Sequence, residues 1–293
     1  MSSQSTRPPT PLGLDLGLEG VHVLITGASG GIGLETAIRF ADQGAIVTAH
    51  YNTNFKPLES FADFKDSRSQ AIQADLSKEE EVVKLFDKAA YTFGPVQVLI
   101  VNHAISIVKD EFLWEMSLDR WKKTMDANLT SSFLVTREYL KRLQQVSTDM
   151  KEDAAIVLIG STAGKYGEAG HADYAASKSA MMYGLTMTLK NEIVKLASFG
   201  RVNCIAPGWV NTAMAKDSLK DPRVAYAALA TTPLKKIAQP SDIAKQILVL
   251  ASNKVSGHVS GQVLMVEGGM EGRVLNRPED LGIKLPAHHA DLD

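Results

Sequence analysis

The chain has 293 residues, 45% of them hydrophobic, and its 31 basic and 33 acidic side chains leave a formal net charge of −2. This balance argues against a general nucleic-acid-binding surface and against a surface for anionic membranes. No apolar stretch approaches the roughly 20 residues of a membrane-spanning helix. Cys204 is the only cysteine, so no intrachain disulfide can form, and we expect a cytoplasmic protein in which Cys204 is a small buried hydrophobic residue.

Patterns typical of buried strands and amphipathic helices alternate along the chain. The first strand, 21–26, runs through a glycine-rich turn into a helix at 31–43. Further strands are predicted at 45–50, 70–74, 96–101, 154–160, 201–206 and 262–266, and further helices at 56–66, 78–92, 117–145, 173–198 and 240–251. Helical crossovers between buried strands predict an α/β fold of Rossmann type: a doubly wound parallel sheet with helices on both faces, in a single domain.

Three segments lie outside this alternation. Residues 1–17 are rich in Ser, Thr, Pro and Gly, lack the apolar core of a signal peptide, and are expected to form a flexible arm. Residues 209–239 interrupt the nucleotide-binding domain (18–270) with a partly helical insertion that would cover an active site. Residues 271–293 form a tail whose His288-His289 pair has no third ligand beside it, so no metal site is predicted.

The glycine-rich turn at 27–33 follows the first strand directly and opens the first helix. Backbone N–H groups and the positive end of a helix dipole meet there, which favours an anion such as a pyrophosphate. The residues expected to contact it are Gly27, Ser29, Gly31, Ile32 and Gly33.

A possible catalytic group lies in the second half of the chain. Tyr174 and Lys178 are four residues apart, hence on one helix face, and Ser161 precedes the tyrosine by thirteen residues. A nearby ammonium favours the phenolate and lowers a phenol pKa from its usual value of about 10. Such a phenol can exchange a proton with a carbonyl or alcohol oxygen, to which Ser161 would also donate. The Tyr-Lys spacing alone is equally typical of a half-exposed amphipathic helix.

Together with T-G-A-S-G-G-I-G at 26–33 and Asn128, this trio resembles the short-chain dehydrogenase/reductase family. The resemblance spans roughly residues 18 to 270 and extends to residues 74–76, 102–104, 207–212 and 261–269. It implies that Tyr174 is the acid or base, that Lys178 tunes it and binds the nicotinamide ribose, and that Ser161 polarises the substrate oxygen. Asn128 would support a water beside the lysine; its alternative is an interior helix residue that is satisfied locally.

The resemblance also implies several dinucleotide contacts. Asp75 would accept from the adenine amino group with the Leu76 N–H nearby, although Asp75 is equally suited to cap the next helix. Asn102 would contact the cofactor or simply close a turn, and the family's usual N-N-A-G reads N-H-A-I here, with His103 and Ile105 as departures. Val210 and Thr212 would anchor the nicotinamide carboxamide.

The end of the second strand indicates which dinucleotide binds. NAD-preferring enzymes place an acidic residue there to hold the ribose hydroxyls, and none occurs between Ala45 and Leu58. Tyr51, Asn52, Thr53 and Lys56 would instead accept a 2′-phosphate, although Gly30 stands where many NADP enzymes carry Arg. We predict NADP(H) rather than NAD(H).

The expected pocket walls are mostly apolar: Ile105, Ser106, Trp114, Thr162, Tyr166, His171, Trp209 and Met214. They favour a small-molecule substrate, a hydrophobic or aromatic ketone or aldehyde, interconverted with its alcohol. Two alternatives stay open: a catalytically silent nucleotide-sensing regulator, and a biosynthetic isomerase, dehydratase or cyclase that retains the cofactor.

The family commonly associates through the two long helices, predicted here at 117–145 and 173–198. The second carries small residues that permit close helix approach, which core packing would explain equally well: Ala175, Ala176, Ser179, Ala180 and Gly184. We predict a homodimer or homotetramer.

Overall fold

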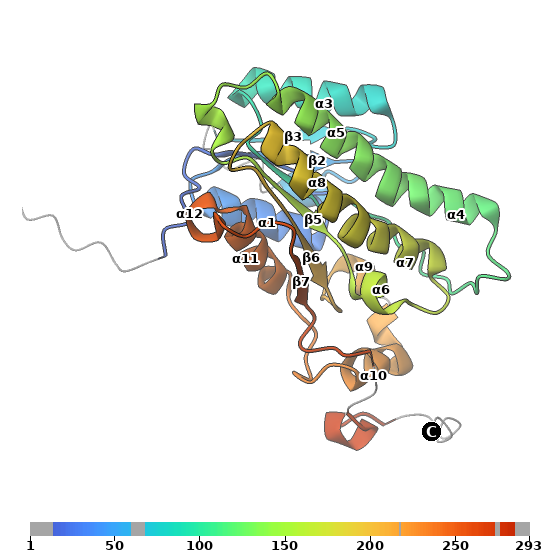
Figure 1. The fold of residues 1–293 in the computed structure, drawn as a ribbon. Coiled ribbons are helices and arrows are strands. Elements are labelled where there is room, and N and C mark those ends of the chain that lie inside the picture. Colours follow the sequence, from blue (N-terminus) through green and yellow to red (C-terminus); the bar gives the residue numbers. More distant parts are fainter. Residues whose placement is uncertain (1–13, 60–67, 217, 273–275, 285–293) are drawn as a thin grey trace, which may run out of the picture.

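The computed structural model describes residues 14–59, 68–216, 218–272 and 276–284. These residues fold around one sheet of seven parallel strands in the spatial order β3-β2-β1-β4-β5-β6-β7 (Figure 1). The strands are β1 (His22–Ile25), β2 (Ile46–Tyr51), β3 (Ser69–Gln73), β4 (Val98–Val101), β5 (Ala155–Ile159), β6 (Arg201–Pro207) and β7 (Val263–Val266). The order reverses between β1 and β4, and ligands of such sheets bind at that point, outside the carboxyl ends of the strands. The predicted single-domain Rossmann-type fold is confirmed.

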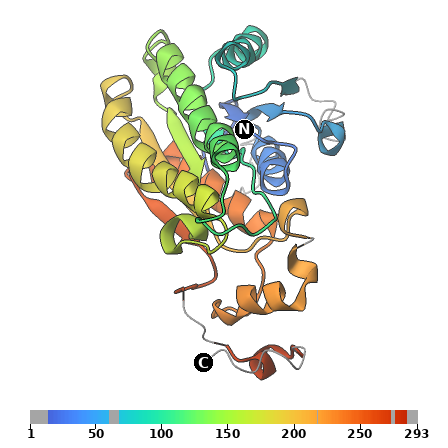
Figure 2. The same cartoon turned by 90° about the vertical axis from the view of Figure 1, so that its right-hand side faces the viewer.

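Helices cover both faces of the sheet (Figures 1 and 2). One face carries α1 (Gly31–Asp42) and α11 (Pro240–Ala251), and the other carries α3 (Glu79–Phe93), α5 (Ser131–Leu143) and α8 (Thr186–Glu192). Successive strand residues point to opposite faces, so Val23 belongs to the core beneath α1 and α11, and Leu24 to the core on the other side. The central strands β4 and β5 are wholly apolar because both faces of the sheet are buried there, whereas the edge strand β3 is mostly polar and only partly buried.

Each of the two long predicted helices contains a π-helical turn. The first consists of α4 (Leu118–Met125), the turn η2 (Asp126–Thr130) and α5. The second consists of α7 (Ala172–Ser179), the turn η4 (Ala180–Leu185), α8 and the 3₁₀ turn η5 (Ile193–Lys195). Hydroxyls that bond back to carbonyls perturb the first helix, since Ser131 donates to Ala127 and Ser132 to Asn128. Single π turns of this kind are frequent at functional sites.

The segment 209–239 forms a separate small layer below the carboxyl edge of the sheet (Figure 1). It contains α9 (Ala213–Lys216), the 3₁₀ turn η6 (Ser218–Lys220) and α10 (Pro222–Ala230). A parallel bridge between Val210 and Ala238 joins its two ends, so the insertion leaves and rejoins the domain at one place.

One predicted helix is described only at its start, and two short helices were not expected. Of the predicted helix at 56–66, the structure shows the 3₁₀ turn η1 (Lys56–Leu58), and 60–66 lie outside the described residues. Short helices were missed at α6 (Thr162–Tyr166) and α12 (Asn253–Ser256). Their few residues carry too little periodicity to be recognised.

Parts of both terminal segments pack onto the domain. The Ser252 hydroxyl donates to the Leu16 carbonyl at 2.5 Å, and Asp15 pairs with Lys254, so the expected flexibility is wrong for residues 15–17. Asn276 in the tail donates to the carbonyls of Leu229 and Thr232 at 2.7 and 2.9 Å, ahead of the 3₁₀ turn η7 (Pro278–Leu281). Residues 1–13 and the His288-His289 pair lie outside the described residues. Within the described part of the chain, no helix has the length and apolarity needed to cross a bilayer.

Candidate active site

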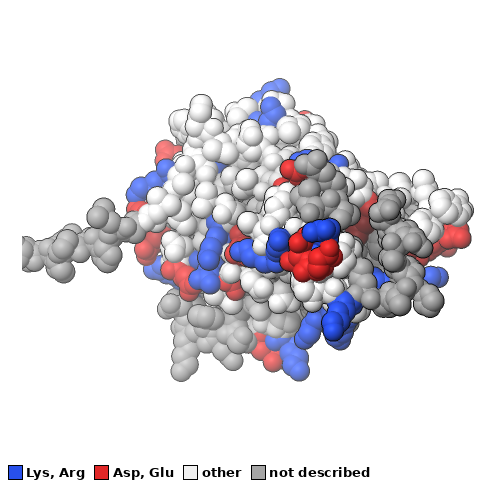
Figure 3. All heavy atoms as spheres, turned by 90° about the horizontal axis from the view of Figure 1, so that it is seen from below, with Lys and Arg blue, Asp and Glu red and all other residues white. Residues whose placement is uncertain are grey.

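A cleft of about 1440 Å³ follows the carboxyl edge of the sheet, lined by loops after all seven strands. Pockets for drug-sized ligands usually enclose roughly 300–1,000 Å³. The cleft therefore has room for a dinucleotide and a substrate side by side. On the molecular face seen from below, acidic and basic side chains are interspersed rather than gathered into a field of one sign (Figure 3).

The glycine-rich loop forms one end of this cleft. Gly27 has a φ of +62°, and a Cβ at this position would lie 2.8 Å from the His103 Cα. Helix α1 begins at Gly31 with no capping side chain and no acidic residue in its first turn. Its first N–H groups thus lack a side-chain acceptor, which is the arrangement that an anion completes. Thr212 closes over the loop, since a Cβ on Gly31 would lie 2.9 Å from its methyl group. This cradle fits a pyrophosphate.

His50, which the sequence-based prediction did not include, supports the glycine loop from below. Its Nδ1 accepts from the Gly27 N–H at 3.0 Å, and its Nε2 donates to the Ala74 carbonyl at 2.9 Å. Burial lowers the pKa of His50 to about 4, so the ring is neutral and this tautomer is fixed. His50 therefore joins the loop after β1 to the end of β3. A polar ring within a buried strand is the signal that would have revealed it.

Asn102 and His103 tie the same loop to β4. The Asn102 amide donates to the carbonyls of Thr26 and Gly27 at 3.1 and 3.0 Å. His103 lies between two hydroxyls, 2.8 Å from that of Thr26 and 2.7 Å from that of Ser131. Burial lowers the pKa of His103 to about 3. Both residues line the cleft, and their hydrogen bonds also hold the walls in place.

The Ser161, Tyr174 and Lys178 side chains meet in the middle of the cleft. Ser161 follows β5 and caps α6, where its hydroxyl accepts from the Ala163 N–H at 3.2 Å. Tyr174 and Lys178 both come from α7. The Lys178 ammonium is buried, donates to the Ile159 carbonyl at 2.7 Å, and lies 5.8 Å from the centre of the Tyr174 ring.

The titration of this trio differs from the expectation. Burial raises the pKa of Tyr174 to about 12, a hydrogen bond with Ser161 opposes this, and the Glu168 charge adds to it. In the protein alone, burial therefore raises the pKa of Tyr174 rather than lowering it, and tuning of the phenol by Lys178 stays a prediction. Burial lowers the pKa of Lys178 itself to about 8. Tyr174 therefore holds its proton at neutral pH in the protein alone.

Asn128 sits in the π turn η2 behind the cleft wall. Its Oδ1 accepts from the Ile105 N–H at 2.7 Å, while its Nδ2 donates to the Ile105 carbonyl at 3.0 Å and to the Ser177 hydroxyl at 3.2 Å. The side-chain amide is thus satisfied locally, and its predicted support of a water beside Lys178 stays a prediction. Asn128 fixes the backbone of Ile105.

At the adenosine end, the loop after β2 presents Asn52, Thr53 and Asn54 to the cleft. Tyr51 does not line the cleft, contrary to its prediction as a contact of the 2′-phosphate. Its ring packs against Phe55 with centroids 5.2 Å apart. It lies on the strand face opposite His50, because successive strand residues point to opposite faces. Asp75 lines the cleft as predicted, but its Oδ1 also accepts from the Ser77 N–H and hydroxyl at 3.1 and 2.7 Å. Helix α3 has Lys78 as its N-cap and no capping side chain, so the helix-capping alternative for Asp75 is wrong, and the adenine contact stays a prediction.

The nicotinamide and substrate end is lined by residues from three loops. Val210 and Thr212 lie there, and so do most of the expected pocket walls: Ile105, Ser106, Thr162, Tyr166, His171, Trp209 and Met214. The prediction that Trp114 is a pocket wall is wrong, because its side chain is 79% exposed and stacks on Phe112 outside the cleft. Gly33 is packed beneath the loop rather than facing the cleft.

Comparison with known proteins places this geometry in a family. A family model described as "Enoyl-(Acyl carrier protein) reductase" matches residues 27–271. The chain belongs to the short-chain dehydrogenase/reductase family. Nodulation protein G of Rhizobium sp. (strain N33) is 34% identical over 253 residues, covering 86% of this chain and 98% of that protein. The 3-oxoacyl-[acyl-carrier-protein] reductase of Staphylococcus epidermidis is 34% identical over 84% of this chain and 97% of its own length.

Two further similarities widen the range of family members. The 3beta-hydroxysteroid dehydrogenase 1 of Eggerthella lenta is 33% identical, covering 86% of this chain and 94% of that protein. A crystal structure of a proposed gluconate dehydrogenase from Agrobacterium tumefaciens superposes with a TM-score of 0.79 at 26% identity, covering 88% of this chain and 98% of that one. The short-chain dehydrogenase/reductase family consists of oxidoreductases that act on CH–OH groups with a nicotinamide cofactor, and this chain is one of them.

Proposed function

We propose that this enzyme is an NADP(H)-dependent reductase of hydrophobic or aromatic ketones and aldehydes, which it interconverts with their alcohols. The observation that carries the proposal is the meeting of Ser161, Tyr174 and Lys178 in one cleft, beside the glycine-rich loop. A nucleotide-sensing regulator would not need a buried, protonated phenol in contact with a serine hydroxyl.

Each residue of the trio has a distinct task. When bound, the nicotinamide ring supplies or accepts the hydride. Tyr174 donates its phenolic proton to the substrate oxygen in reduction and takes one back in oxidation. Ser161 donates a hydrogen bond to the same oxygen and holds it in line with the phenol. Lys178, fixed by the Ile159 carbonyl, places its positive charge where the phenolate forms and would contact the nicotinamide ribose.

The choice of NADP(H) rests on the loop after β2. Asn52, Thr53 and Asn54 offer amide and hydroxyl groups to the cleft, and no acidic residue lies between Ala45 and Leu58 to repel a 2′-phosphate. A carboxylate at this place would favour the free ribose hydroxyls of NAD(H) instead.

The choice of a hydrophobic substrate rests on the cleft walls, where Ile105, Val108, Trp209 and Met214 contribute apolar surface. The name of the Eggerthella lenta relative refers to a hydroxysteroid, which is a hydrophobic alcohol. Within the cleft-lining residues the only lysine and arginine are Lys178 and Arg223, and Arg223 pairs with Asp221 at 2.7 Å. Uncharged substrates therefore suit these walls best.

We also propose a cytoplasmic homodimer or homotetramer. The long helices carry exposed apolar side chains, including Phe133 on α5 and Tyr183 in η4, and a partner copy would cover them. Cys204 is buried, and burial raises the pKa of its thiol to about 12, as suits a reduced, unreactive cysteine. Light scattering that gives a monomer mass would contradict the assembly.

A panel of ketones, aldehydes and alcohols, assayed with each of the four nicotinamide dinucleotides, tests the activity. We expect turnover of aryl and alkyl ketones by NADPH, with lower kcat/KM for NADH. If the protein binds the dinucleotide but turns over no carbonyl and no alcohol of the panel, the result would favour the regulator or the non-redox biosynthetic enzyme.

A further inference from the structure

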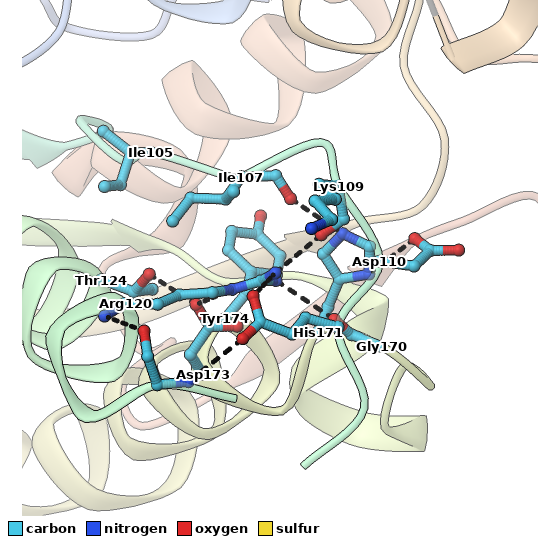
Figure 4. A network of polar contacts seen from close by, with 12 residues as sticks. Ile105, Ile107, Lys109, Asp110, Arg120, Thr124, Gly170, His171, Asp173 and Tyr174 are labelled. Atoms are coloured by element: carbon cyan, nitrogen blue, oxygen red, sulfur yellow. Dashed lines mark hydrogen bonds and ion pairs between the residues drawn. The ribbon is translucent and has the colours of Figure 1, made fainter. Parts of the chain in front are cut away.

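We propose that Arg120 is a positioning residue: its buried guanidinium fastens the substrate-side wall of the cleft to the helix that carries Tyr174. This inference rests on the proposed carbonyl reduction and assigns a role to a residue outside the Ser161, Tyr174 and Lys178 trio. Figure 4 shows the network around Arg120.

The wall in question is the irregular segment between β4 and α4, residues 104–111. Its even-numbered residues line the cleft: Ala104, Ser106, Val108 and Asp110. Of the odd-numbered residues, Ile105 also lines the cleft, and Ile107 and Lys109 do not. Their backbone groups are bound one after another by side chains from the helices behind.

Three side chains hold these backbone groups in sequence. Asn128 binds both the N–H and the carbonyl of Ile105, and His171 lies with its Nε2 3.0 Å from the Ile107 carbonyl. Arg120 donates to the Lys109 carbonyl at 2.7 Å. The wall is thus held at every second residue, which fixes its distance from the phenol.

Arg120 also binds residues at the start of α7, whose N-cap is His171. Its guanidinium donates to the Gly170 carbonyl at 3.1 Å and to the Asp173 carboxylate at 3.2 Å, and it pairs with Glu111 at 3.2 Å. Asp173 directly precedes Tyr174 in the chain. One planar group, with its donors in a fixed fork, therefore joins the wall, the preceding loop and the catalytic helix.

We call the contacts of Arg120 with Lys109, Gly170 and Asp173 the clamp. Its electrostatics support the same role. Burial acts to raise the pKa of Asp173, but hydrogen bonds from Thr124 and Arg120 outweigh it and hold that pKa below the usual range. The Arg120 and Asp173 side chains are 6% and 2% exposed, so neither charge is satisfied by water. Removing the guanidinium would leave an uncompensated carboxylate one residue from Tyr174, which destabilises strongly.

The test separates positioning from plain stability. Arg120→Met removes the fork, and Arg120→Met/Asp173→Asn removes the orphaned charge as well. We expect the double variant to regain most of the lost thermal stability while kcat for ketone reduction stays about tenfold or more below wild type. The clamp is overturned if kcat returns together with the melting temperature.

Arg142 provides a matched control. It lies on α5, donates to Glu138 at 2.7 Å, to Asp87 at 2.9 Å and to the Val83 carbonyl at 3.3 Å, and it does not line the cleft. Arg142→Met should lower the melting temperature and leave kcat and KM within about twofold of wild type. A loss of kcat equal to that of the Arg120 variants would show that removing any arginine with several partners has this effect.

Amide hydrogen exchange gives a readout that needs no activity. Arg120→Met should speed exchange of the Glu111 N–H, which donates to the Gly170 carbonyl at 3.0 Å, while Arg142→Met should not. If wild type reduces no carbonyl, the proposed function fails, and this exchange still decides whether the clamp exists. Unchanged exchange at Glu111 would overturn the clamp even in an active enzyme.

Discussion

The two halves of the cleft are built in different ways. In the dinucleotide half, backbone geometry comes first: a glycine with positive φ, an uncapped helix start, and neutral His50 and His103 rings that brace the loop from behind. In the substrate half, an irregular wall is held by side chains that reach its carbonyls, above all Arg120 and His171. The first half suits a ligand that many proteins share, and the second can change its lining residues while its backbone stays fixed.

Lys178 should show the largest effect where the two halves meet. Its ammonium is present below its pKa of about 8 and is lost as the pH rises through that value. We therefore expect kcat/KM for ketone reduction to fall above that pH. Lys178→Met should lower kcat/KM by about 10²–10³-fold and remove this limb of the profile. A variant with wild-type rates would separate the lysine from the chemistry.

His50 tests the dinucleotide half through stability. Its folded-state pKa is lowered, so the unfolded chain binds the proton first, and stability is lost as the pH falls below the ordinary histidine value. The shift from the usual 6.5 to about 4 corresponds to roughly 3 kcal/mol of unfolding free energy, lost between those two values. Urea denaturation at several pH values should show this slope, and His50→Asn should make it shallower, leaving the part that the buried His103 ring contributes. An equal slope in the variant would assign the loss to other groups.

Asn52→Asp tests the cofactor assignment. A carboxylate in the loop after β2 should repel a 2′-phosphate and accept the ribose hydroxyls. We expect kcat/KM for NADPH to fall about tenfold, with an equal or higher value for NADH. Asn54→Gln, also in this loop, leaves the loop uncharged and serves as the control. NADPH preference that survives the new carboxylate would place the phosphate elsewhere.

The smallest effect is expected from Trp114, which is exposed outside the cleft. Trp114→Ala should leave kcat/KM for any ketone within about twofold of wild type. Val108→Trp, on the cleft side of the wall, should instead select against bulky ketones. Steady-state kinetics with a small and a large aryl ketone compares the two, and a strong effect of Trp114→Ala would mean that the substrate extends beyond the cleft.

The sequence predicted the dinucleotide half better than the substrate half, for a physical reason. Strand, glycine turn and helix are consecutive in the chain, so their periodicity and spacing specify the loop at 27–33 locally. The wall at 104–111 has no periodicity of its own, and its shape depends on Asn128, His171 and Arg120, which are distant in sequence. The error at Tyr51 came from the strand's alternation, since a shift of one residue moves a side chain to the other face of the sheet.

The clearest test of the central claim is Tyr174→Phe, measured for both chemistry and cofactor binding. Loss of the phenolic proton should reduce kcat by about 10³-fold, while fluorescence titration gives a dissociation constant for NADPH close to that of wild type. Wild-type turnover by this variant would contradict the account, because the cleft would then supply the proton from another group.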